Sequence, residues 1–443
     1  MAKKYFGTDG IRGIAFEKLN SELAFKLGQA LAKSYKLEEL VIGQDTRLSS
    51  NMLAYGVAYG AALAGVNVKI AEVVSTPMVA YYSKVNNIFG VMITASHNPY
   101  TDNGIKVIKS GYKLLDEEDL ELEKYIDEDD ILVSPKFGSI TVTREVEELY
   151  LSVYSDLNLT KTSMKITYDS ANGANYIIAK KIIESFASHT YQIGNTPDGL
   201  NINLNVGSTH LDAITNAVKN NGSDIGLSFD GDGDRILVID KDGITYDGDY
   251  IVYIIAKYLK SKGKLKKDTV VLTQMSNPGM LKAFKSLGSK VLQTPVGDKY
   301  VSEEIMNHDL SIGGENSGHI IINDLLPSGD GLFAGVYILK ILEENKTTLK
   351  DYTKEVVMYP QKMVNIKNVD KEVLKHPEIV RLVEEVRRNL PEDSLLLVRP
   401  SGTEPLVRVT ISCQDILELD KYMGLLVTKI QNLGSLNKWK IML

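Results

Sequence analysis

Short apolar runs rich in Val and Ile alternate along the chain with longer segments whose apolar residues recur at helical spacing. Leu40–Gly43 and Val66–Ala71 have the length and composition of buried strands. Ser21–Leu37 and Asn51–Ala64 have the period of helices. This order favours parallel strands joined by crossover helices. The first part of the chain therefore predicts an α/β domain with helices on both faces of a sheet.

The same order recurs in the middle of the chain. Strands at Lys165–Tyr168 and Tyr191–Ile193 enclose a helix at Ala174–Ser185. A strand at Ile225–Phe229 follows, and residues 269–293 repeat the order of strand, helix and strand. These segments predict two further domains of the same kind.

The last part of the chain has a different order. It predicts one strand, one helix, two strands and a final helix, at Met363–Ile366, Pro377–Asn389, Ser394–Val398, Leu406–Cys413 and Ile416–Leu433. Two consecutive strands favour antiparallel pairing, which is typical of a small α+β domain.

A chain of 443 residues is too long for one hydrophobic core. We therefore predict three similar α/β domains with mixed, mostly parallel sheets, over residues 1–155, 156–249 and 250–362. A smaller α+β C-terminal domain follows over residues 363–443. Ligands of parallel sheets gather at loops beyond the strand ends, so we expect the four domains to surround a central cleft.

The composition narrows the classes of partner. The formal net charge is −7 and no block of basic residues occurs, so neither nucleic acid nor an anionic membrane surface is an expected partner. No segment approaches the roughly 18–20 apolar residues of a membrane span, and no apolar stretch follows the first lysines. We therefore expect a cytoplasmic protein. The single cysteine, Cys413, excludes an internal disulfide and is expected to be buried.

Three carboxylates alternate with glycines at Asp230, Asp232 and Asp234, directly after a predicted strand. Glycine lets the backbone turn tightly enough for the carboxylates to converge, and a cation would relieve their repulsion. An EF-hand is excluded because Arg235 stands at its glycine position and Lys241 at its closing glutamate position. The pattern predicts a site for Mg²⁺ or Ca²⁺, with a solvated acidic turn as the alternative.

A second polar segment, Thr94–Pro99, places Ser96 beside His97 at the end of an apolar run. An acyl-transfer pair is poorly supported, since no G-x-S-x-G surrounds the serine. A phosphate acceptor fits better, because a phosphoserine is dianionic and can supply an oxygen to a metal. Taken alone, a serine in a polar turn is more often structural.

Two further loops suit recognition of a phosphorylated sugar. Arg399–Pro405, with Arg408 beyond it, combines cations, hydroxyls and a glycine amide that could hold a phosphate group. Gly313–His319 offers a carboxylate and a hydroxyl to sugar hydroxyls. A hairpin turn and a glycine-rich surface loop are the alternatives. No Walker A sequence and no G-x-G-x-x-G after a strand occurs.

These four loops and the opening segment Tyr5–Gly13 resemble the α-D-phosphohexomutase family, in the family's order and over essentially the whole chain. Within that family the chain is similar to the branch that acts on glucosamine phosphates. The resemblance implies a phosphorylated Ser96 and a Mg²⁺ ion bound by Ser96, Asp230, Asp232 and Asp234. The implied catalytic residues are Ser96, Lys106, Arg12, His97 and His319. The implied substrate-binding residues are Arg235, Glu315, Ser317, Arg399, Ser401, Gly402, Thr403 and Arg408.

Lys106 is the expected general acid/base, because a lysine among cations can have a lowered pKa. The implied reaction interconverts glucosamine 6-phosphate and glucosamine 1-phosphate through glucosamine 1,6-bisphosphate. This reaction serves the synthesis of UDP-N-acetylglucosamine and peptidoglycan precursors. The resemblance also implies a homodimer. Thr94 and Lys299 depart from that branch, which usually has Ser and Arg there. A mutase for mannose or glucose phosphates is therefore the nearer alternative, and a non-catalytic sugar-phosphate binder the farther one.

Overall fold

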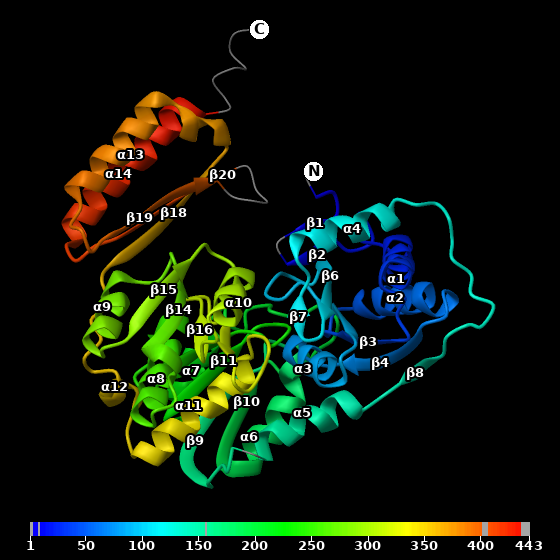
Figure 1. Ribbon diagram of the computed structural model, residues 1–443. Coiled ribbons are helices and arrows are strands. Elements are labelled where there is room, and N and C mark those ends of the chain that lie inside the picture. The colour runs from blue at the N-terminus through cyan, green and yellow to red at the C-terminus, as the bar shows by residue number, and fades with distance from the viewer. Residues whose placement is uncertain (1–2, 8, 156, 401–405, 436–443) are drawn as a thin grey trace. The chain divides into compact units, whose positions relative to one another are not determined.

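The computed structural model describes residues 3–7, 9–155, 157–400 and 406–435 (Figure 1). The chain divides into two compact units, which are described separately below. One contains residues 1–274 and 292–353, and the other contains residues 275–291 and 354–443. None of the helices in the described ranges combines the length and the apolar character needed to cross a membrane.

The first sheet has eight strands, in the order β1-β2-β6-β5-β3-β4-β8 with β7 beside β6. Its strands are β1 (Phe6–Gly7), β2 (Gly10–Ile14), β3 (Glu39–Gln44), β4 (Asn67–Val73), β5 (Phe89–Ile93), β6 (Asp102–Lys109), β7 (Tyr112–Lys113) and β8 (Ile140–Val142). Strands β5, β3, β4 and β8 are parallel, whereas β6 runs antiparallel to β5 and β2.

Five helices accompany this sheet: α1 (Ser21–Tyr35), α2 (Ser50–Leu63), α3 (Thr76–Asn86), α4 (Asp116–Ile126) and α5 (Glu145–Ser155). Apolar residues of α1, α2 and α4 share one core with the sheet, and α3 packs against α5 away from that core. The β5–β6 connection, at the carboxyl end of β5, carries Ser96.

The second sheet has the order β10-β9-β11-β12-β13, with β10, β9 and β11 parallel and β12 and β13 antiparallel. Its elements are β9 (Thr162–Asp169), a 3₁₀ turn (Ala174–Tyr176), α6 (Ile178–Phe186), β10 (Ala187–Ile193), α7 (Asp212–Asn221), β11 (Ile225–Phe229), β12 (Ile236–Asp240) and β13 (Thr245–Tyr246). The tight turn between β11 and β12 carries the three aspartates.

The third sheet has the order β15-β14-β16-β17. Its elements are α8 (Gly248–Ser261), a 3₁₀ turn (Lys266–Asp268), β14 (Thr269–Thr273), β15 (Lys290–Thr294), α10 (Asp298–Asn307), β16 (Ile312–Gly314), β17 (Ile320–Ile322), α11 (Gly331–Asn345) and α12 (Leu349–Tyr352). Helix α11 is almost fully buried and packs against α8 and the strands β11 and β12. It therefore joins this sheet to the second one.

The second unit contains a three-stranded antiparallel sheet in the order β18-β20-β19. Its elements are α9 (Pro278–Ser286), β18 (Gln361–Lys367), a 3₁₀ helix (Lys371–Lys375), α13 (Pro377–Asn389), β19 (Leu395–Pro400), β20 (Leu406–Ser412) and α14 (Ile416–Gly434). The apolar faces of α13 and α14 share one core with the sheet, and Cys413 is buried in it as predicted.

The predicted α/β class, with mixed sheets and a smaller α+β C-terminal part, is confirmed. Most predicted strands and helices agree with the structure to within a few residues. The predicted helix at Ala174–Ser185 is instead a 3₁₀ turn followed by α6. Strand β6 was not predicted, because polar residues interrupt its apolar positions.

Candidate active site

Ser96 lies in a buried turn whose backbone is held from both sides. Its φ angle is +52°, a left-handed conformation that is uncommon for a residue with a side chain. The Ser96 N–H donates to Oγ1 of Thr94 at 2.9 Å. The Ser96 carbonyl accepts hydrogen bonds from Arg47 at 3.0 Å and from Asn203 at 2.9 Å. These contacts fix the direction of the hydroxyl, which donates to Oδ2 of Asp230 at 2.6 Å.

A buried ion pair between Asp45 and Arg47 contacts the Ser96 turn and stabilises it. Nε of Arg47 lies 2.9 Å from Oδ2 of Asp45, and both side chains are fully shielded from solvent. The same carboxylate accepts the hydroxyl of Thr94 at 2.7 Å, while Arg47 also reaches the carbonyl of Asn98 at 2.9 Å. Sequence reasoning missed Asp45, Arg47 and Asn203. The polar residues after β3 were the available signal.

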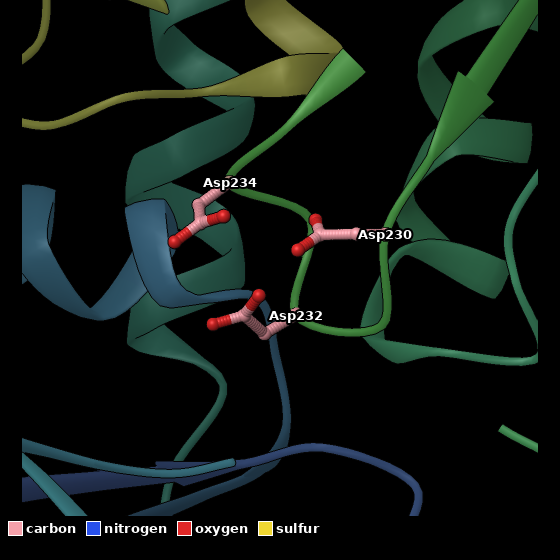
Figure 2. A group of neighbouring side chains, drawn as sticks. All are labelled: Asp230, Asp232 and Asp234. Atoms are coloured by element: carbon pink, nitrogen blue, oxygen red, sulfur yellow. The ribbon is translucent and has the colours of Figure 1, made fainter. Parts of the chain in front are cut away.

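Asp230, Asp232 and Asp234 project from the β11–β12 turn into the same space (Figure 2). One carboxylate oxygen from each lies within 4.8 Å of the other two, and all three side chains are buried. The turn needs glycine, because a Cβ on Gly231 would lie 2.5 Å from the carbonyl oxygen of Ser96. Among the described residues, Oδ1 of Asp232 and Oδ1 of Asp234 are buried without a hydrogen-bond partner. Buried carboxylate oxygens that accept no hydrogen bond suit a divalent cation.

The three carboxylates have different electrostatic surroundings. Burial, together with the charges of Asp234 and Asp232, raises the pKa of Asp230 well above its ordinary value. Burial would also raise the pKa of Asp234, but Lys106 and His319 outweigh it and hold that pKa well below the ordinary value. Burial and mutual repulsion therefore oppose the simultaneous ionisation of the three carboxyl groups, and a bound cation would favour their charged forms.

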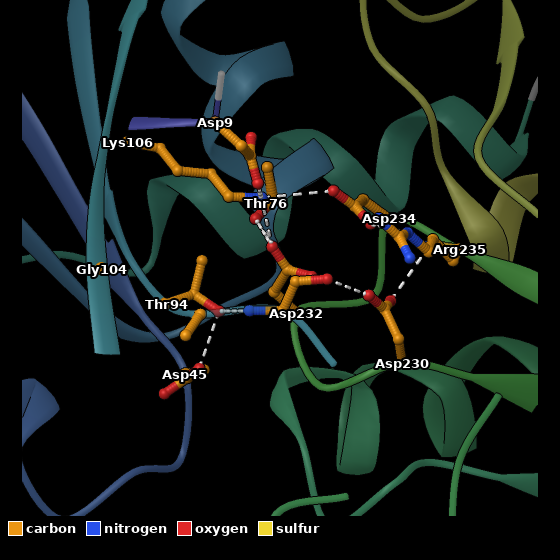
Figure 3. Close-up of polar contacts among 12 residues, drawn as sticks. Asp9, Asp45, Thr76, Thr94, Gly104, Lys106, Asp230, Asp232, Asp234 and Arg235 are labelled. Atoms are coloured by element: carbon orange, nitrogen blue, oxygen red, sulfur yellow. Dashed lines mark hydrogen bonds and ion pairs between the residues drawn. The ribbon is translucent and has the colours of Figure 1, made fainter. Parts of the chain in front are cut away.

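Lys106 extends from β6 into the carboxylate cluster, as Figure 3 shows. Its Nζ lies 2.8 Å from Oδ2 of Asp232, 3.3 Å from Oδ2 of Asp234 and 3.3 Å from Oδ2 of Asp9. Burial would lower the pKa of Lys106, but the three carboxylates raise it well above the ordinary value. The expected lowered pKa is therefore wrong. The positive charge of Arg12 does lower the pKa of Lys106, as expected, but the carboxylates raise that pKa by more.

Arg12 and His97 lie beside the serine turn. The Arg12 guanidinium pairs with Asp9, and one of its nitrogens lies 3.4 Å from the carbonyl oxygen of Ala95. Nδ1 of His97 is 3.3 Å from Oγ of Ser96. Burial, with the charges of Arg235 and Arg12, lowers the pKa of His97 to about 4, so its imidazole is neutral at pH 7.

A second loop, between β16 and β17, meets the aspartate turn through its backbone. Arg235 and His319 form an antiparallel bridge, and the N–H of Arg235 donates to Oδ1 of Asp230 at 3.1 Å. Nδ1 of His319 lies 3.6 Å from Oδ2 of Asp234. The aspartate turn and the predicted sugar loop thus form one continuous site.

Glu315 and Ser317 occupy the sugar loop predicted from the sequence. Oε1 of Glu315 accepts the N–H of Gly297 at 3.0 Å, and burial followed by the charge of Asp298 raises the pKa of Glu315. The hydroxyl of Ser317 is buried without a hydrogen-bond partner among the described residues. Both side chains therefore have polar atoms that a ligand could satisfy.

Arg399 and Arg408 belong to the second unit. They are direct partners in the β19–β20 ladder, so their side chains emerge on the same face of the sheet. Nε of Arg408 donates to Oδ1 of Asn365 at 2.9 Å. Two like charges at opposed positions favour a bound anion between them. The predicted residues Ser401, Gly402 and Thr403 lie outside the described residues.

Comparison with known proteins matches successive parts of the chain to domains of one family. Models of the phosphoglucomutase/phosphomannomutase α/β/α domains I, II and III match residues 3–132, 147–243 and 247–359, and the model of its C-terminal domain matches residues 363–423. Curated phosphoglucosamine mutases of Anoxybacillus flavithermus and Oceanobacillus iheyensis are 42% and 41% identical to this chain. The alignments cover 95% and 98% of this chain and 97% and 100% of those proteins.

Two solved structures have the same fold. A phosphoglucomutase/phosphomannomutase family protein from Burkholderia thailandensis has a TM-score of 0.80 at 20% identity, over 98% of each chain. Aspergillus fumigatus N-acetylphosphoglucosamine mutase, in complex with GlcNAc-6P and magnesium, has a TM-score of 0.69 at 18% identity, over 98% of this chain and 96% of that one. With four domain models matched in order and curated relatives above 40% identity, this chain belongs to the phosphoglucomutase/phosphomannomutase family.

Proposed function

We propose that this protein interconverts glucosamine 6-phosphate and glucosamine 1-phosphate by moving a phosphoryl group through Ser96. Curated phosphoglucosamine mutases that are 41–43% identical over nearly the whole chain support this substrate. The observation that carries the chemistry is the 2.6 Å contact between Oγ of Ser96 and Oδ2 of Asp230. It joins a hydroxyl nucleophile to a buried cluster of three carboxylates.

In the first half of the reaction, the phosphoryl group on Ser96 passes to the free hydroxyl of the sugar phosphate. The bond between phosphorus and Oγ of Ser96 breaks and a bond between phosphorus and the sugar oxygen forms. The proton of the accepting hydroxyl passes, in net terms, to Oγ of Ser96, which leaves as a free hydroxyl. The product is glucosamine 1,6-bisphosphate. In the second half, the other phosphoryl group of that bisphosphate returns to Ser96 and the isomeric monophosphate leaves.

We propose Mg²⁺ as the cation that Asp230, Asp232 and Asp234 hold; it would supply positive charge close to the transferring phosphoryl group. The chain's own cations surround the same place. Lys106 contacts two of these carboxylates, and the Arg12 guanidinium lies beside the Ser96 turn. Fixed cations stabilise the charge that develops on a phosphoryl group without needing to reorganise.

We propose that Glu315 and Ser317 bind sugar hydroxyls and that His319 faces the reacting end of the sugar. The buried oxygen of Ser317 and the buried carboxylate of Glu315 support this role. Arg399 and Arg408, as opposed cations on one sheet face, are proposed to bind a phosphate group together with the 401–403 segment.

The two departures from the glucosamine branch have explanations that do not involve the sugar. The Thr94 hydroxyl contacts Asp45 and the Ser96 N–H, and the side chain is fully buried. A serine would supply the same hydroxyl. Nζ of Lys299 lies 2.6 Å from Oδ1 of Asp116, so it forms an ion pair within the protein. Neither residue therefore favours a mutase for mannose or glucose phosphates.

Two features implied by the resemblance complete the proposal. The protein is proposed to be a homodimer, which sedimentation equilibrium of the purified chain would test. It is also proposed to work in the cytoplasm, which fractionation of the source cells would test.

The test of function is mutase turnover with glucosamine 6-phosphate, mannose 6-phosphate and glucose 6-phosphate in parallel. Each assay contains Mg²⁺ and a trace of the matching bisphosphate. We expect glucosamine 6-phosphate to give the highest kcat/KM. A preference for mannose 6-phosphate or glucose 6-phosphate would be consistent with the mechanism but would overturn the proposed substrate. No turnover with any of the three sugar phosphates would overturn the proposed function.

A further inference from the structure

Lys113, the last residue of β7, bridges two carboxylates that come from different parts of the first unit. Its Nζ lies 2.5 Å from Oδ2 of Asp298, at the start of α10, and it also pairs with Oδ1 of Asp9, in the turn between β1 and β2. The three side chains are each at least three-quarters shielded from solvent. Without the ammonium, two carboxylates would face each other at close range.

Each of these carboxylates holds one of the site's proposed catalytic groups. Oδ2 of Asp9 pairs with the Arg12 guanidinium, which reaches the Ala95 carbonyl next to the serine turn. Oδ2 of Asp298 lies 3.5 Å from Nε2 of His319. The other ring nitrogen of that histidine faces the aspartate turn, so the imidazole is held from both sides.

We propose that Lys113 is a positioning residue for phosphoryl transfer. By joining Asp9 to Asp298, it fixes the separation of Arg12, on strand β2, and His319, in the loop before β17. In the proposed reaction these two groups face the transferring phosphoryl group. This inference rests on the proposed function. Lys113 itself is not proposed to touch the substrate, and sequence reasoning gave it no role.

A neighbouring ion pair provides a matched comparison. Lys299, the residue after Asp298, pairs with Oδ1 of Asp116 at 2.6 Å. This pair also joins α10 to the first sheet's domain, but its carboxylate is largely exposed and no contact links it to Arg12 or His319 among the contacts described. If the bridging lysines only held the two elements together, removing either would have the same effect.

The test compares Lys113→Met with Lys299→Met in the full chain, using glucosamine 6-phosphate. We expect Lys113→Met to lower kcat by about tenfold or more while KM changes little, because misplaced groups slow the chemical step. Lys299→Met should change both constants by no more than about twofold, as expected for an ion pair whose carboxylate is largely exposed to solvent. Lys113→Arg should restore part of the lost kcat. Equal effects of the two methionine variants, or an unchanged kcat in Lys113→Met, would overturn the proposal.

A spectroscopic measurement separates this proposal from the proposed function. In the enzyme with ¹⁵N-labelled histidines, the ring resonances of His319 are assigned with His319→Asn. We expect Lys113→Met to shift them and Lys299→Met to leave them in place. Unmoved His319 resonances in Lys113→Met would overturn the linkage even if the wild type turns over. If the methionine variant does not fold, by circular dichroism, Lys113→Gln is compared in its place with the same expectations.

Discussion

The hydroxyl of Ser96 donates a 2.6 Å hydrogen bond to Oδ2 of Asp230, although 134 positions separate the two residues in the chain. The turn after β5 and the turn after β11 therefore meet at the carboxyl ends of parallel strands that belong to two different mixed sheets. Neither turn could form this site alone. The serine supplies a nucleophile without a cation site, and the aspartates supply a cation site without a nucleophile.

Replacing Ser96 with alanine tests the nucleophile. The variant should lose at least about 10³-fold in kcat, because the covalent route through the hydroxyl is removed. Its fold should persist, since the backbone contacts of the turn remain. The measurements are mutase turnover and mass spectrometry of the peptide containing residue 96.

Ser152→Ala is the matched control, because its exposed hydroxyl donates to the backbone carbonyl of Leu149 within α5. It should keep wild-type turnover and the phosphate on Ser96. Near-normal activity of Ser96→Ala, or phosphate found on another residue in the active enzyme, would contradict the assignment.

Replacing Asp232 with asparagine tests the cation site. The wild type should be stabilised by Mg²⁺, since a ligand at about 100 times its Kd adds roughly 2.7 kcal/mol to the free energy of unfolding. Asp232→Asn should lose most of that stabilisation together with turnover. Thermal unfolding with Mg²⁺ and with a chelator measures the stabilisation by Mg²⁺. Asp242→Asn, an exposed aspartate, is the control and should respond as the wild type does. A Mg²⁺ response retained in Asp232→Asn would place the ion elsewhere.

The pattern of apolar and polar residues could predict the fold, because short apolar strands alternate with helices of regular apolar spacing in each α/β domain. The antiparallel C-terminal part was predicted nearly to the residue, since β20 and α14 have clean apolar periods. The site could be predicted where its residues are contiguous, as at Ser96 and at the aspartate turn. Contiguous motifs are visible in a sequence without knowledge of packing.

The supporting residues could not be predicted in this way. Asp45 and Asn203 act on the Ser96 turn from 49 and 107 positions away, and a single polar residue gives no pattern. The pKa of Lys106 was predicted with the wrong sign for the same reason. Its cationic neighbours are evident from the motifs, whereas the nearness of Asp9 and Asp232 depends on tertiary structure.

Replacing Thr94 tests whether this departure from the glucosamine branch affects sugar choice. Thr94→Ser keeps the hydroxyl that joins Asp45 to the Ser96 N–H, so the ratio of kcat/KM values between sugars should stay within about twofold. Thr94→Val removes the hydroxyl and leaves a buried carboxylate short of a donor. It should lose about 1–3 kcal/mol of stability by urea unfolding. A changed sugar preference in Thr94→Ser would show that this position senses the substrate.

A pH dependence of stability should come from Asp330, which caps the N-terminus of α11. Its Oδ1 accepts the Phe333 N–H at 2.9 Å and its Oδ2 accepts the Tyr150 hydroxyl at 2.6 Å. Burial raises the pKa of Asp330 from 3.8 to about 6, although these hydrogen bonds oppose the shift. The folded state therefore binds a proton more tightly than the unfolded chain does.

The sign of the effect follows from that difference. The stabilising contribution of protonated Asp330 is fully present below the unfolded pKa near 3.8 and is lost as pH rises through about 6. The loss should amount to about 2–3 kcal/mol. Asp330→Asn keeps a capping oxygen but cannot titrate, so its free energy of unfolding should lack this fall. Urea unfolding of both proteins from pH 4.5 to 7 gives the contribution of Asp330 as the difference between their free energies of unfolding. Parallel curves for the two proteins would mean that Asp330 is ionised in the fold at acid pH and that its hydrogen bonds outweigh its burial.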